Sequence, residues 1–283
     1  MKIKKLRIGV IIVFLMGACI SVQAQGILKG SLESNTILYV DDDEINSKAP
    51  KNSIGSNNYL KLDYTLDKFS AGLQMEYYPH PLQGFQRELK GFGIPYKYLS
   101  WTEKHWEVTV GDFYEQFGSG LILRSWEDRQ LGFNNSLGGG RLTLNFMDNA
   151  IMGKILYGVP RYYLRSKGMG YETFDNVFDA YSSTHLIGGD LSLSLNQLLL
   201  EDSPHTFVLE GSVVNRYEKT APNELIALAD AYGFSIPRNV LSYSGRLAYS
   251  YRRLSVKGEY VHKSGDFYSE HVAKGEKYKL NSG

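Results

Sequence analysis

Apolar and polar residues alternate along most of the chain from residue 58 onward, in segments of about ten residues. Such a period of two is expected of β-strands whose two faces meet different surroundings. In the segment 59–66, Leu60 and Leu62 share one face, whereas Lys61 and Asp63 share the other. The same sorting recurs in segments 69–77, 105–110, 141–146, 187–196, 241–250 and 254–260.

One segment departs from this pattern. Between residues 205 and 217, Val208 and Val214 fall on the face that also carries Glu210 and Arg216. The segment still has the length and composition of a strand, so we predict a strand with a less regular polar face.

The connections between these segments alternate between short and long. The short ones are 66–68, 102–104, 147–149, 199–204 and 252–253, and the long ones are 79–93, 115–137, 161–184, 218–239 and 264–278. A meander with short turns at one end and long loops at the other is typical of outer-membrane β-barrels, in which the short turns are periplasmic. We therefore predict an all-β, transmembrane antiparallel up-and-down β-barrel. About eleven strands are present, beginning with 26–39, and Lys279 and Leu280 could begin a twelfth.

The main alternative is a soluble antiparallel sandwich, which also alternates but buries its apolar face in a core. The barrel is favoured because the segments approach the 9–11 residues of a tilted membrane strand. A sandwich also does not predict the alternation of connection lengths.

The N-terminus resembles an export signal. A basic start (Lys2, Lys4, Lys5 and Arg7) precedes the apolar run 8–20, and small residues lead to Ala24. We predict a signal peptide over residues 1–24, cleaved after Ala24, and a barrel domain over 25–283. A lipoprotein attached at Cys19 is an alternative, whereas a membrane anchor would need about 20 apolar residues.

Composition agrees with an exported protein that does not bind nucleic acid. The chain has 31 basic and 30 acidic residues, and loses four cations with the signal, so no basic surface for nucleic acid is indicated. Cys19 is the single cysteine, and therefore the mature chain has no disulfide. The 21 tyrosines suit the aromatic belts of a membrane protein.

The stretch 111–129 is the most distinctive in the chain, because it mixes glycines, aromatics and paired charges. We expect an ordinary external loop held by salt bridges. The alternative is a loop that folds into the lumen and forms a constriction, with Arg124, Glu127, Asp128 and Arg129 facing solute. The inward strand faces carry both signs of charge, as expected of a water-filled or salt-bridged lumen: Lys61, Asp63, Glu76, Glu107, Arg141, Lys154, Arg246, Lys257 and Glu259.

Other candidate sites give weaker signals. The acidic run 41–44 lacks the spacing of an EF-hand, so we expect a solvated loop rather than a Ca²⁺ site. The Gly118-Ser119-Gly120 sequence is not a nucleophile elbow, and the histidines at positions 80, 105, 185, 205, 262 and 271 have no regular spacing to a serine. Residues 223–230 are predicted to form a short surface helix. We predict no catalytic residue, cofactor or metal.

A resemblance to a known family follows from the run that starts at Gly111 and ends in Leu131-Gly132-Phe133-Asn134-Asn135, together with the leader ending in Ala24-Gln25-Gly26. The chain resembles an uncharacterised outer-membrane β-barrel family of Bacteroidota over most of its mature length. The resemblance implies an outer-membrane location and carries no catalytic residues. Members of that family are typically longer than this chain.

The C-terminal residues 281–283 do not form the apolar, aromatic-ended strand that closes a bacterial barrel. We therefore expect an N-terminal part of a longer protein, or one that needs partner strands; the alternative is a complete 12-stranded barrel. The expected function is a non-enzymatic conduit or a surface and assembly scaffold. Its expected partners are outer-membrane lipid, the barrel-assembly machinery and a small solute. A lipid-acting hydrolase and a secreted β-sandwich binding module are the alternatives.

Overall fold

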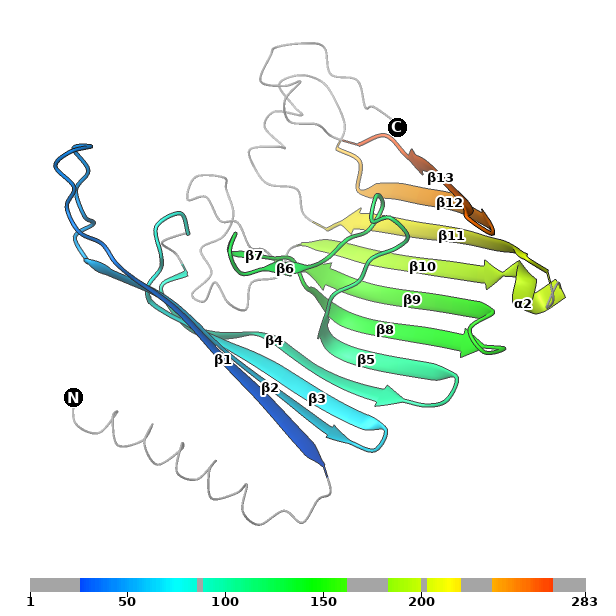
Figure 1. Cartoon of the computed structure of the whole chain (residues 1–283), viewed down its shortest axis with the longest axis horizontal. Helices are drawn as coiled ribbons and strands as arrows, with labels where there is room; N and C mark the ends of the chain where they lie inside the picture. The colour runs from blue at the N-terminus through cyan, green and yellow to red at the C-terminus, as the bar shows by residue number, and fades with distance from the viewer. Residues whose placement is uncertain (1–25, 86–88, 162–182, 200–202, 220–235, 267–283) are drawn as a thin grey trace, which may run out of the picture.

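The computed structural model describes residues 26–85, 89–161, 183–199, 203–219 and 236–266, which form an 11-stranded antiparallel sheet. Strands that follow one another in the chain are neighbours in the sheet, except that a small hairpin separates β5 from β8 (Figure 1). The order is β1 (Ile27–Leu38), β2 (Ile54–Leu66), β3 (Phe69–His80), β4 (Gly91–Thr102), β5 (Trp106–Phe113), β8 (Leu137–Phe146), β9 (Ile151–Pro160), β10 (Thr184–Ser194), β11 (His205–Glu218), β12 (Asn239–Tyr251) and β13 (Leu254–Lys263).

Two small elements complete the described chain. The hairpin consists of β6 (Glu127–Asp128) and β7 (Phe133–Asn134), and helix α2 (Leu195–Leu199) joins β10 to β11. None of the helices in these ranges is long and apolar enough to span a membrane. The predicted signal peptide at 1–24, the helix at 223–230 and the strand start at 279–280 lie outside the described residues.

The sheet curls into a trough whose open side is spanned by the segment between β5 and β8 (Figure 1). Within the described residues, the outer edges of β1 and β13 are not paired with another strand. The all-β, up-and-down antiparallel topology confirms the sequence prediction, including about eleven strands. That further strands close the barrel stays a prediction.

Four of the five short connections are tight turns, whereas the β10–β11 connection contains helix α2. The predicted strand segment 187–196 is therefore wrong at residues 195 and 196, which are helical. Asp67 and Arg252, which begin the turns after β2 and β12, have φ angles of 51° and 50°. This left-handed conformation matches the twist of the flanking strands and permits a two-residue reversal. The short turns therefore lie together at one end of the sheet, and the long connections lie at the other (Figure 1).

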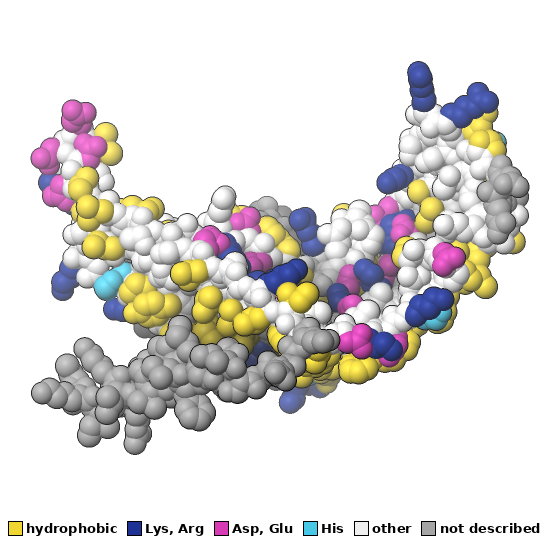
Figure 2. Space-filling model, turned by 60° about the horizontal axis from the view of Figure 1, so that its bottom comes forward, with side chains coloured by type: hydrophobic (Ala, Val, Ile, Leu, Met, Phe, Trp, Pro, Cys, Tyr) yellow, Lys and Arg dark blue, Asp and Glu magenta, His cyan; other side chains and the backbone are white. Residues whose placement is uncertain are grey.

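The two faces of the sheet differ in chemistry. Hydrophobic side chains cover the convex face, and charged side chains gather in the hollow (Figure 2). Exposed apolar residues of the convex face include Leu99, Val110, Ile155, Leu191 and Leu247, and buried polar residues of the concave face include Gln74, Thr109, Ser192, Ser212 and Arg246. The alternative of a soluble sandwich is therefore wrong for the described residues. A sandwich buries its apolar faces between two packed sheets, whereas this sheet leaves its apolar face exposed.

Candidate functional site: a loop folded across the concave face

The segment 114–136, here called the inserted loop, connects β5 to β8 and lies over the concave face of the sheet (Figure 1). Its first half, the finger (115–125), reaches toward β9–β13. Its second half (126–135), which contains the β6–β7 hairpin, reaches toward β1–β3. The expectation of an ordinary external loop is wrong, because side chains from both halves bond to inward-facing residues of the strands.

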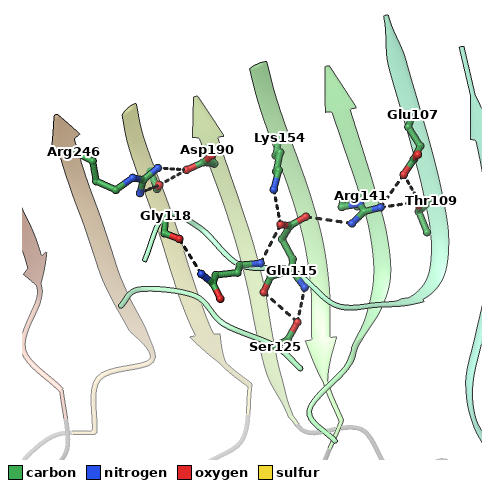
Figure 3. Close-up of polar contacts among 11 residues, drawn as sticks. Glu107, Thr109, Glu115, Gly118, Ser125, Arg141, Lys154, Asp190 and Arg246 are labelled. Atoms are coloured by element: carbon green, nitrogen blue, oxygen red, sulfur yellow. Dashed lines mark hydrogen bonds and ion pairs between the residues drawn. The ribbon is translucent and has the colours of Figure 1, made fainter. Parts of the chain in front are cut away.

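The finger is closed by bonds between its two arms. The Phe117 amide donates to the Leu123 carbonyl at 3.1 Å, and the Ser125 amide donates to the Glu115 carbonyl at 2.8 Å. The Ser125 hydroxyl in turn accepts from the Glu115 amide at 2.7 Å (Figure 3). At the tip, Gly118 has a φ of 54°, a conformation that favours glycine. The finger is thus a compact unit with its own backbone bonds.

An apolar cluster holds the finger against the sheet. The Phe117 side chain is fully buried, and Leu123 packs beside it. A Cβ at Gly188 of β10 would lie 3.0 Å from Phe117 Cε2, so the glycine leaves room for the ring. The strand residues in this cluster are Phe113, Leu137, Leu156 and Val214.

Val214 also explains part of the irregular pattern noted between residues 205 and 217. It points to the concave face of β11, where water or polar groups would otherwise lie, because the finger covers it. An apolar residue on a polar strand face was therefore the sequence signal for the docking position of the finger.

A buried carboxylate forms the second attachment of the finger. The Glu115 side chain is 5% exposed, and it accepts from Lys154 Nζ at 2.7 Å and from Arg141 Nη1 at 3.3 Å. Arg141 also donates to Glu107 at 2.8 Å (Figure 3). One loop carboxylate therefore faces cations from two neighbouring strands, β8 and β9.

The tip of the finger lies on a cluster of charges from β10–β13. A Cβ at Gly118 would lie 2.2 Å from Arg246 Nη1, so the tip passes directly over this guanidinium. The Ser119 hydroxyl donates to the Glu259 carboxylate. The carboxylates around Arg246 are those of Asp190 at 2.7 Å, Glu210 at 3.0 Å and Glu259 at 3.8 Å.

The hairpin half is attached to the opposite wall by Arg129. Its guanidinium pairs with Glu33 of β1 at 2.7 Å, donates to Gln74 of β3 at 2.8 Å, and lies 4.8 Å from the centre of the Tyr59 ring. Gln74 also donates to Glu127 of the hairpin at 2.6 Å. The inserted loop is thus attached to both walls of the trough.

The four loop residues that were predicted to face solute have different roles. Arg124 is exposed, and its guanidinium lies 5.0 Å from the centre of the Trp126 ring. Asp128 accepts from the amides of Gln130 and Leu131 at 2.9 and 3.1 Å, which closes the hairpin turn. Glu127 and Arg129 attach the loop to the wall. Of the four, Arg124 is the one whose charge is turned to solvent.

The predicted lumen residues of β2 and β3 lie on the concave face. Lys61 pairs with Asp63 at 3.5 Å, and Asp63 accepts from the Tyr98 hydroxyl at 3.1 Å. Glu76 is buried, and it accepts from Gln74 and from Tyr78, each at 2.9 Å.

The remaining predicted residue, Lys257 of β13, is exposed near the edge of the sheet. The sequence did not single out Tyr114, whose ring stacks on Tyr96 with centres 5.1 Å apart. Burial raises the pKa of the Tyr114 phenol, so this group at the base of the loop stays neutral.

In the described ranges, no group of three or more His, Cys, Asp or Glu residues could hold a metal ion. In the acidic run 41–44, Asp41 and Asp43 pair with Lys48 at 3.2 and 2.8 Å. The ring nitrogens of His185 and His205 bond to the hydroxyls of Tyr157 and Tyr249 at 2.7 and 2.8 Å. His271 lies outside the described residues.

These features define an all-β protein with an exposed apolar convex face and a polar concave face crossed by one loop. The chain belongs to a family of unknown function (DUF6029), whose model matches residues 3–283. The resemblance to an uncharacterised family is thereby confirmed, whereas its restriction to Bacteroidota stays a prediction. No curated protein matches the chain.

Among solved structures, a match is OmpTdeltaL8, the loop L8 deletion mutant of OmpT, an outer membrane protein of Vibrio cholerae. It is 11% identical, with a TM-score of 0.33, and the match covers 84% of this chain and 82% of that one.

Proposed function

We propose that this chain forms the wall of a non-enzymatic outer-membrane β-barrel that conducts small polar solutes, with the inserted loop narrowing the lumen. The attachment of this loop to both walls of a polar concave face carries the proposal. Partners are outer-membrane lipid along the convex face and the barrel-assembly machinery, and residues 1–24 act as the export signal.

The spacing of aromatic groups supports a membrane position. At the long-loop end, His185 lies 6.0 and 6.2 Å from the rings of Tyr157 and Tyr217, and at the short-turn end His205 lies 4.4 Å from Tyr251. His205 and Tyr217 are twelve positions apart in β11, or about 40 Å at about 3.4 Å per residue. A tilt of about 40° reduces this to about 30 Å, the thickness of the hydrocarbon core.

The absence of enzymatic activity is part of the proposal. A lipid-acting hydrolase of the outer wall would need a serine beside a histidine. In the described part of the chain, the hydrogen bonds of the histidine rings involve tyrosine hydroxyls and the Asn145 carbonyl. A hydrolase would be revealed by lipid hydrolysis that is lost on substitution of one serine.

A scaffold with a plugged lumen is the second candidate. It is favoured by the number of attachments of the inserted loop, because a loop bound at both walls could fill the trough rather than narrow it.

Planar-bilayer recordings of the full-length protein separate the two candidates. The wild-type protein is compared with a variant in which residues 116–134 are replaced by a short Gly/Ser linker. A conduit predicts discrete conductance steps for the wild-type protein and larger steps for the variant. Steps from the variant alone would favour the plugged scaffold, and no steps from either would refute the conduit. Heat-modifiable migration and recovery in the outer-membrane fraction test the barrel and its location.

A further inference from the structure

A second concave feature lies at the long-loop end, away from the finger. Described residues of the β1–β2 and β3–β4 connections line a cavity of about 400 Å³. The two connections are joined by a bond in which the Gln83 amide donates to the Tyr39 hydroxyl at 2.9 Å. Small-molecule sites usually measure about 300–1,000 Å³. The cavity is therefore large enough for a small organic ligand.

The walls of the cavity combine an apolar surface with cations. Its apolar lining comes from Tyr39, Pro50, Ile54, Pro81, Leu82 and Phe85. The cations are Lys51 and Lys90, the imidazole of His80 also lines the cavity, and among the described lining residues none is an Asp or a Glu.

The two lysines of the cavity differ from another lysine of the same region. Lys48 is held by Asp41 and Asp43 at 3.2 and 2.8 Å, so its charge is already balanced. Lys51 and Lys90 take part in no ion pair among the described residues. A cavity with unbalanced positive charge and an apolar surface attracts an anion that also has an apolar body.

We propose that this cavity binds a small organic anion from the aqueous phase, namely a carboxylate attached to an apolar ring. The ring lies against the apolar lining, and the carboxylate lies beside Lys51 and Lys90. The site is formed by connections beyond the ends of the strands, which favours a dissolved ligand over a membrane lipid. The proposal goes beyond the conduit function, because binding here requires no flow through the lumen.

The cavity also adjoins the inserted loop. Phe85 lines the cavity, and a Cβ at Gly132 of the loop would lie 2.7 Å from Phe85 Cδ1. A ligand in the cavity would therefore contact the same ring that packs against the hairpin half of the loop.

Binding of three ring compounds of similar size tests the site. Benzoate, benzamide and benzylamine are titrated against the detergent-solubilised full-length protein by calorimetry. We expect benzoate to bind up to about fivefold more tightly than benzamide, the gain of one ion pair, and benzylamine to bind most weakly. Equal binding of benzoate and benzamide, or preference for benzylamine, would overturn the proposal.

A double variant assigns the binding to this cavity. Lys51→Gln with Lys90→Gln should reduce benzoate affinity to the level of benzamide, whereas Lys104→Gln, an exposed lysine at the short-turn end, should leave it unchanged. Heat-modifiable migration confirms that each variant folds. Undiminished benzoate binding in the double variant would place the ligand elsewhere. Conductance is recorded separately, so failure of this site and failure of the conduit give different results.

Discussion

The two halves of the inserted loop are held by different chemistry. The finger buries Phe117 in an apolar cluster and sets one buried carboxylate between two cations. The hairpin half is held by hydrogen bonds to Gln74 and by the pair of Arg129 with Glu33, whose side chains remain 24% and 42% exposed. Charge screening by salt does not weaken apolar burial, whereas it weakens partly exposed ion pairs. The comparison shows that one loop can have a firmly fixed half and a half that is released more easily.

Approximate energies support this ranking. Truncation of a buried phenylalanine costs about 3–5 kcal/mol. Ion pairs that remain partly exposed contribute about 0–1 kcal/mol. The finger should therefore stay docked under conditions in which the hairpin half opens, and amide hydrogen exchange can follow each half separately.

Phe117→Ala should have the largest effect. Loss of the buried ring removes about 3–5 kcal/mol of docking free energy, so exchange of the Phe117 and Ser125 amides should rise by about 10²–10⁴-fold. Leu121→Ala is the matched control, because Leu121 is 70% exposed in the same finger. Equal exchange in the two variants would mean that the apolar cluster does not hold the finger.

Glu115→Gln should have an intermediate effect. The substitution keeps the size of the side chain but removes the charge that faces Lys154 and Arg141. Hydrogen bonds to charged groups contribute about 1.5–3 kcal/mol, so exchange in the finger should rise by about 10–10²-fold. Exchange in the hairpin half should change little if the two halves are held independently. A parallel rise in both halves would show that they dock as one unit.

Arg129→Gln should have the smallest effect, confined to the hairpin half. The partly exposed pair with Glu33 contributes about 0–1 kcal/mol, so exchange in residues 127–134 should rise by up to about fivefold in low salt. The difference from the wild-type protein should shrink as salt is added. Arg124→Gln, which removes an exposed cation from the finger, provides the control. A salt-independent effect would indicate that lost hydrogen bonding to Gln74 dominates.

The strands could be predicted from the sequence because their signal is local. Each strand separates two environments, so alternation within a few residues, such as Lys61 and Asp63 against Leu60 and Leu62, reports the fold directly. The positions of the short turns followed from the same alternation. A tight turn such as the one at Asp67 can be predicted without knowing which distant residues are in contact.

The position of the inserted loop could not be predicted in the same way. Its attachments join residues far apart in the chain, such as Arg129 with Glu33, and no period within the loop encodes them. The composition of the loop singled out Arg129 and Glu127 as charged groups that could face solute. In the structure, both side chains instead attach the loop to the wall. Phe117 and Glu115 were not singled out as anchors. Val214 of β11 and Leu156 of β9, apolar residues on polar strand faces, carry a trace of the finger elsewhere in the sequence.

The crossing of the trough by this loop also bears on the order of folding. Arg129 and Glu33 are 96 positions apart, and Ser119 and Glu259 are 140 apart. Closing such long segments is entropically costly, and neither contact can form before the walls have curled toward each other. We therefore expect the loop to dock late, after the strands have paired. A chaperone that binds the unclosed sheet would then find residues 114–136 extended and accessible for binding.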